Sequence, residues 1–280
     1  MNRPPRQRKW REYMISVDIA IHRVRRDITL GVLLKAFLVA ALFAVLIFAQ
    51  PQPVRFAALA GIVGIWIALS ITSARSSRLA MDSPALIATG QFDEAERRID
   101  QAMRAFSLFG PPKLRALHQL AVLRHAQQRW QDAAALCKAL LGHRIGMSRG
   151  LTTPSRLILA ESLLELNDLP GSFVTVRDLY SQTLSLEEVL NVMSLQLDYE
   201  SRIGAWGKMF DGATTKTQLA ELMPSPAAAR VQALLALAAL KSGRPDWADW
   251  LRRRAELLAD VNSLTAGRPM LWELWKKSGE

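Results

Sequence analysis

The sequence has a single cysteine, Cys137, among its 280 residues. One thiol allows neither an internal disulfide nor a metal site built from cysteines, so a disulfide-stabilised secreted fold is excluded and a reducing compartment is permitted. The chain also lacks the motifs of a phosphate-binding loop, a dinucleotide-binding turn, a zinc-dependent hydrolase and a nucleophile elbow. We therefore expect no catalytic, cofactor or metal site.

Acidic residues are missing from two long apolar runs near the N-terminus. Residues 28–49 hold one charge, Lys35, and residues 54–74 hold one charge, Arg55. A helix rises about 1.5 Å per residue and the hydrocarbon core of a bilayer is about 30 Å thick, so each run is long enough to cross it. We predict a hairpin of two transmembrane helices over residues 28–74, with each lone cation reaching back to the nearest interface.

The two runs are separated by residues 50–53, which include two prolines. Proline ends a helix because it has no N–H and clashes with the preceding turn, so the chain is expected to reverse there. Eight Lys/Arg precede the first run, whereas the hairpin loop offers only Arg55. The positive-inside rule then puts both termini in the cytoplasm. We expect a multi-pass protein of a bacterial-type inner (plasma) membrane.

Residues 1–27 form a basic arm, with eight Lys/Arg and three Asp/Glu. Apolar residues from Trp10 to Val24 recur at helical spacing, apart from most of the basic ones. Two interpretations fit this helix: it lies on anionic lipid headgroups, or it packs on the protein's own soluble domain. A nucleic-acid partner is disfavoured, because residues 75–280 hold 26 Lys/Arg against 22 Asp/Glu and are close to balance.

From residue 76 onward the sequence has helical periodicity, and no stretch of alternating β-branched residues occurs, so we predict an all-α domain. A turn with Gly90, a bulky Phe92 and a small Ala95 forms a pattern that recurs every 37 to 39 residues, and its small position is a methionine only in the fourth unit. Such a pattern lets two antiparallel helices nest. The turn positions are Gly90, Gln128, Asn167, Gly204 and Gly243; the bulky positions are Phe92, Trp130, Leu169, Trp206 and Pro245; the small positions are Ala95, Ala133, Ser172, Met209 and Ala248.

This pattern resembles the tetratricopeptide (TPR) repeat over residues 76–262. The resemblance implies a TPR-like α-solenoid of about five helical hairpins, and we expect residues 263–280 to cap it with an apolar face of Leu271, Trp272 and Trp275. The period is longer than the ~34 residues of the standard repeat. Extended turns are therefore expected where Pro and Gly gather, at 108–113, 146–155 and 222–228.

The resemblance also implies a function, because TPR arrays usually have no catalytic centre and bind peptides or proteins in a groove lined by the first helix of each pair. We expect a membrane-anchored scaffold or adaptor with protein partners. The alternatives are lipid or nucleic-acid binding by the basic arm, and an enzyme without a recognisable motif. With first helices starting near Leu114, Thr153 and Ala229, the groove residues are Arg115, His118, His125, Glu161, Glu165, Arg230 and Lys241.

Two pairs among these residues could suggest chemistry. His118 and His125 lie on one helical face but ~10 Å apart along the axis, too far to share a metal directly. Glu161 and Glu165 are four residues apart, with no histidine or further acid near them in the sequence, so a solvated helix face is preferred over a paired-carboxylate site. Cys137 is predicted to be a small buried hydrophobe.

Overall fold

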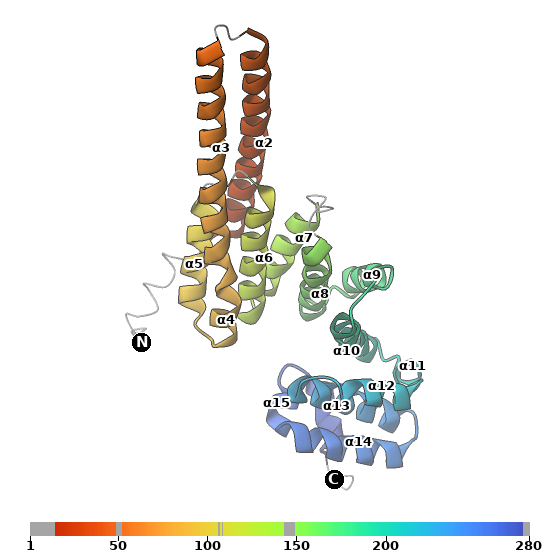
Figure 1. Cartoon of the computed structure of the whole chain (residues 1–280). Helices are drawn as coiled ribbons and strands as arrows, with labels where there is room; N and C mark the ends of the chain where they lie inside the picture. The colour runs from red at the N-terminus through yellow and green to blue at the C-terminus, as the bar shows by residue number, and fades with distance from the viewer. Residues whose placement is uncertain (1–14, 49–51, 106, 108, 143–148, 277–280) are drawn as a thin grey trace, which may run out of the picture. The chain divides into compact units, whose positions relative to one another are not determined.

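The structure is a computed structural model that describes residues 15–48, 52–105, 107, 109–142 and 149–276 (Figure 1). These residues are mostly helical and include no strand, which confirms the all-α class. The chain divides into two compact units, Met1–Ser162 and Leu163–Glu280. The first contains α2 (Val17–Phe48), α3 (Gln52–Met81), α4 (Ser83–Ala88), α5 (Phe92–Arg104), α6 (Gly110–Ala126), α7 (Trp130–Gly142) and most of α8 (Arg149–Glu165). The second contains α9 (Leu169–Tyr180), α10 (Leu186–Arg202), α11 (Trp206–Phe210), α12 (Ala213–Ala220), α13 (Ser225–Lys241), α14 (Pro245–Leu258), α15 (Val261–Thr265) and the 3₁₀ helix η1 (Pro269–Leu274).

α2 and α3 form an antiparallel hairpin that projects beyond the other helices of the first unit (Figure 1). Both helices are long and apolar enough to cross a membrane. Of the most apolar stretch of each helix, only 11% is buried in α2 and 0% in α3. A core helix of a soluble protein would be mostly buried, so these exposed apolar side chains are unusual for a protein surface in water. The side chain of Arg55 is outside the described part of the structure, so its reach back to the nearest interface stays a prediction.

The N-terminal part of α2 packs on the first unit itself. Ala20 and Val24 are fully buried, and Arg23 forms an ion pair with Asp100 of α5 at 3.2 Å. The described part of the basic arm, residues 15–27, therefore packs on the protein's own helices, as in the second of the two interpretations given for this segment. The rest of the basic arm lies outside the described residues.

Lys113 of α6 holds α2 from a second side. Its side chain is 1% exposed, and its ammonium lies 2.8 Å from the carboxylate of Asp27 and donates to the carbonyl oxygen of Met103 at 2.5 Å. That carbonyl is in the last turn of α5, where helix carbonyls have no partner within the helix. One buried cation thus joins α2, α5 and α6.

Arg124 holds the chain just before α2. Its guanidinium is fully buried and binds both carboxylate oxygens of Glu96, at 2.6 and 3.0 Å. The backbone of Ile15 completes the cluster, because its N–H donates to Glu96 at 2.9 Å and its carbonyl accepts from Arg124 at 3.1 Å. We call these three residues the Ile15 clasp.

The five predicted turn positions all have the left-handed backbone conformation that a sharp turn requires. Their φ values are 75°, 58°, 60°, 70° and 71° in chain order. In each turn the next residue donates its N–H to the carbonyl five positions earlier, at 2.8 or 2.9 Å, which is the Schellman bond that closes a helix. The following helix then begins at the predicted bulky residue, and α5, α7, α9, α11 and α14 start there. The turn positions are confirmed, and the assignment to TPR repeats stays a prediction.

The fourth pair, which matches the pattern least well, has a broken second helix. α11 stops at Phe210, and Gly212 with φ 65° starts a new helix, α12. Met209 fills the position of the small residue and is fully buried. The larger side chain therefore accompanies a shorter helix.

The predicted starts of three first helices are wrong by four residues. α6, α8 and α13 begin at Gly110, Arg149 and Ser225. In α6 and α13 the reason is that the prolines near these starts lie in the first turn of the helix, whereas in α8 the helix continues through Pro154. The first turn needs no N–H partner, so proline begins a helix as readily as it ends one. Much of each expected extended turn is therefore helical, namely residues 110–113, 149–155 and 225–228, whereas residues 108 and 143–148 lie outside the described residues.

α13 is the central helix of the second unit. Residues 231–239 are all fully buried, and α10, α11, α12, α14 and η1 pack around them. The many alanines in this helix let its neighbours approach closely, and Leu234, Leu235 and Leu237 fill the space between them. This arrangement gives the second unit a continuous apolar core.

The C-terminal segment packs on this core. Leu271 and Leu274 are buried, and Arg268 forms a buried ion pair with Asp198 of α10 at 2.5 and 3.3 Å. Trp272, expected on the same face as Leu271, is instead 43% exposed. The segment is a 3₁₀ helix, in which side chains three positions apart lie on one face, so Leu271 pairs with Leu274 rather than with its neighbour.

We predict that Gly243→Ala lowers the free energy of unfolding by about 1 kcal/mol, because an alanine is strained at positive φ. Nothing lies within 4 Å of a Cβ added at Gly243, so the loss would come from the backbone alone. Denaturant unfolding of the full chain in detergent measures it. Gly150→Ala is the matched control, because that site also has space but an ordinary φ. Equal stability of the two variants would contradict the prediction.

We also predict that Arg124→Met lowers the free energy of unfolding by about 3–5 kcal/mol, because it leaves the Glu96 carboxylate buried without its cation. Arg104→Met is the control. Arg104 forms an ion pair with Asp100 on the surface, with 69% of the arginine side chain exposed, and such pairs contribute at most about 1 kcal/mol. A loss at Arg124 no larger than that at Arg104 would show that the clasp does not stabilise the unit.

Candidate functional site

The seven predicted groove residues lie on α6, α8 and α13 and have different surroundings. Arg115 is exposed, whereas Arg230 is partly buried and makes a polar or electrostatic interaction within the protein. The other five make specific contacts within the protein. These contacts join His118 to Ser155, His125 to Glu161, Glu165 to Arg202, and Lys241 to Glu273.

His118 is a buried structural contact between α6 and α8. Its side chain is almost completely buried, and its Nδ1 lies 3.1 Å from Oγ of Ser155. Burial lowers the pKa of His118 to about 4, because the charged imidazolium would lose its hydration. At neutral pH the ring is therefore uncharged and cannot serve as a cation for a bound ligand.

His125 and Glu161 are the two predicted site residues that the structure brings together. The Nε2 atom of His125 lies 3.1 Å from the Glu161 carboxylate, and Trp130 packs edge-on against the imidazole with ring centroids 5.0 Å apart. An imidazole beside a carboxylate can hold or transfer a proton. No group of three His, Cys, Asp or Glu side chains that could hold a metal occurs in the described part of the chain.

The two glutamates of α8 do not form a solvated face, so that expectation is wrong for Glu165. Its side chain is 22% exposed and binds Arg202 of α10 at 2.6 Å. Arg202 also donates to the carbonyl of Leu164 at 2.6 Å, which fixes the end of α8. Each glutamate thus has its own basic partner, and Glu165 has a structural role.

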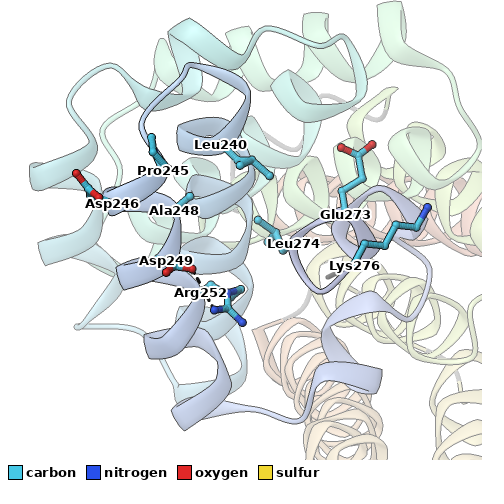
Figure 2. A pocket seen from close by; sticks show the side chains of 9 residues that line it. All are labelled: Leu240, Pro245, Asp246, Ala248, Asp249, Arg252, Glu273, Leu274 and Lys276. Carbon is cyan, nitrogen blue, oxygen red and sulfur yellow. Dashed lines mark hydrogen bonds and ion pairs between the residues drawn. The ribbon is translucent and has the colours of Figure 1, made fainter. Parts of the chain in front are cut away.

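The second unit has a surface hollow of about 290 Å³ between α13, α14 and the C-terminal segment (Figure 2). Figure 2 shows Leu274 between α14 on one side and Glu273 with Lys276 on the other. The wall carries charges of both signs, and two of them are paired, since Arg252 donates to Asp249 at 3.0 Å. The lining contains no histidine, cysteine or serine, and consists of Leu240, Pro245, Asp246, Ala248, Asp249, Arg252, Glu273, Leu274 and Lys276. It offers neither a nucleophile of these types nor a strong charge preference.

The buried cations Lys113 and Arg124 were missed by sequence reasoning. Arg124 does carry a recognisable signal, because it continues the apolar stripe of Leu117 and Leu120 along α6. A charged residue in such a stripe is buried only when it is paired. Cys137, in contrast, is fully buried as predicted, and burial raises the pKa of its thiol to about 12.

Comparison with models of known protein families, with curated proteins and with solved structures finds no match to this chain.

We predict that stability falls as the pH drops from 6.5 to 4, because the unfolded chain takes up a proton at His118 that the folded protein does not. The loss attributable to this residue is on the order of 3 kcal/mol. His118→Asn should lose this part of the pH dependence. Denaturant unfolding at pH 7, 5.5 and 4 measures it, with His22→Asn on the exposed side of α2 as the control. An unchanged pH profile in His118→Asn would refute the assignment.

Proposed function

We propose that this protein is a membrane-anchored adaptor that binds other proteins through a TPR-like solenoid. The observation that carries the proposal is the hairpin of α2 and α3, which is apolar and exposed at one end and packed on α5 and α6 at the other. Exposed apolar surface of this extent is stable in a lipid environment. The anchor and the helical pairs of the first unit would then move as one body.

The proposed location is a bacterial-type inner membrane, crossed twice, with both termini in the cytoplasm. Charge supports this orientation, because the arm before α2 is rich in Lys/Arg and the loop between the helices is not. Asp27, at the edge of the apolar run, is paired with Lys113, so it does not oppose insertion of the run as a lone carboxylate would.

Protein binding is supported by the repeated turns and by exposed apolar side chains on the second unit. Phe173 and Val174 of α9 are 47% and 46% exposed, and Leu186 at the start of α10 is 59% exposed. Exposed apolar side chains of this kind favour a protein partner over a small polar ligand.

Two alternatives remain as proposals of another class. The basic arm could bind anionic lipid headgroups or nucleic acid, and its binding would then weaken steeply with salt. The pair of His125 and Glu161 could serve proton transfer in an enzyme, but the described residues around it supply no nucleophile with a base and orienting group in contact.

We predict that photo-crosslinking residues at Val174 and at Arg115 each capture a protein partner from native membranes, whereas one at Lys138 does not. All three positions are exposed, so the substitutions do not disturb the core, and Lys138 on α7 is the control. Leu186→Asp should reduce capture at Val174 several-fold, because a charge at an exposed apolar position of the second unit opposes its burial in an interface.

Equal capture at Lys138, or no protein adduct at either test position, would contradict the adaptor function. Adducts with lipid alone that are lost at high salt would favour the basic-arm alternative instead.

A further inference from the structure

The start of α6, with Phe109 just before it, lies against α2 at the base of the hairpin. A Cβ added at Gly110 would lie 3.8 Å from Cγ1 of Ile28, and the ammonium of Lys35 lies 5.0 Å from the ring centroid of Phe109. The segment Phe109–Pro112, which we call the α6 corner, is thus level with the stretch of α2 from Ile28 to Lys35. This stretch is the first part of the apolar run.

The length of α2 decides where a bilayer would meet this corner. At about 1.5 Å per residue, the helix is about 20 Å long from Lys35 to its end at Phe48, and about 30 Å long from Ile28. Only the longer segment matches the ~30 Å of a hydrocarbon core. A bilayer that covers it reaches past the α6 corner by up to about 10 Å.

The backbone of the α6 corner is suited to an apolar surrounding. A helix start normally exposes four N–H groups without partners, but Pro111 and Pro112 have none. The N–H of Phe109 donates to Oγ of Ser107 at 3.3 Å, and the Ser107 hydroxyl donates to the Phe109 carbonyl at 2.8 Å. The cost of moving this helix end out of water is therefore small, because few of its polar groups need water.

The side chains of the α6 corner also favour an apolar environment. Phe109 is aromatic and only partly buried, Pro111 is exposed, and neither carries a charge. The Lys35 ammonium over the Phe109 ring resembles the pairing of aromatic and basic side chains at membrane interfaces, where each keeps an apolar body in lipid and a polar end near the headgroups. The ion pair between Lys113 and Asp27 then lies on the water side of the corner.

We infer that the α6 corner is a third membrane contact, embedded at the boundary between acyl chains and headgroups of the leaflet next to the helical domain. This inference rests on the membrane anchoring in the proposed function. The first unit then sits directly on the bilayer, since both the hairpin and the corner hold it. The backbone of Lys35 then lies about 10 Å inside the edge of the apolar run, and its ammonium, over the Phe109 ring, reaches back toward the headgroups.

The test uses the full chain with single cysteines at Phe109 and, separately, at Pro111, each labelled with an environment-sensitive fluorophore. The protein is reconstituted into vesicles of phosphatidylethanolamine and phosphatidylglycerol that contain nitroxide lipids with the nitroxide near the headgroup or deep in the chain. The native Cys137 is retained, because it is fully buried. Ala126→Cys at the exposed end of α6 is the water-side control, and Phe43→Cys on the exposed face of α2 is the membrane control.

The expected result is quenching at 109 and 111 that exceeds quenching at 126 by at least about two-fold and is stronger with the shallow nitroxide than with the deep one. Phe43 should show the opposite depth preference. If the label at 43 is quenched but those at 109 and 111 behave like that at 126, the corner is not in the membrane and the anchor stands. If the label at 43 is not quenched either, the membrane anchoring fails, and this inference fails with it.

Discussion

The pairing of a fully buried guanidinium with Glu96 is the constraint on which the first unit depends. Arginine stays charged at any accessible pH, so Arg124 can be buried only while a carboxylate and further acceptors surround it. Those acceptors include Glu96 of α5, the carbonyl of Ile15 in the chain entering α2, and the side-chain oxygen of Gln127 just after α6. The direction of α2, and with it that of the apolar hairpin, is thereby fixed relative to the helical pairs. A flexible linker between the proposed anchor and these pairs is absent from the described residues.

Features set by a few neighbouring residues could be predicted from the sequence. The turns at Gln128 and Asn167 were found because a sharp helical turn needs a left-handed residue, and the pattern behind it marks the next helix. The apolar runs were found by length alone. The starts of α6 and α13 were missed because proline permits both the end and the first turn of a helix, and only packing decides between them.

The candidate site was less predictable, because it depends on residues far apart in the sequence. The resemblance to a peptide-binding groove placed His118 and Glu165 at its surface, whereas the structure engages them with Ser155 and Arg202. Neither partner could be deduced from helical periodicity, which tells which face a residue occupies but not which helix covers that face. Arg115 and Lys241 are the groove residues that are exposed in the structure, and Lys241 pairs with Glu273.

The Ile15 clasp also determines the order in which this chain can be assembled. Arg124 lies 109 positions after Ile15, so the guanidinium emerges from the ribosome well after the apolar hairpin has been synthesised. Contacts between distant residues form only when both have been made, and domains generally fold as units during synthesis. The Ile15 clasp therefore cannot close until Arg124, near the end of α6, has been made, although α2 can contact α5 before then. Insertion of the hairpin would precede closure of the clasp, which makes the junction between anchor and domain a late step of biogenesis.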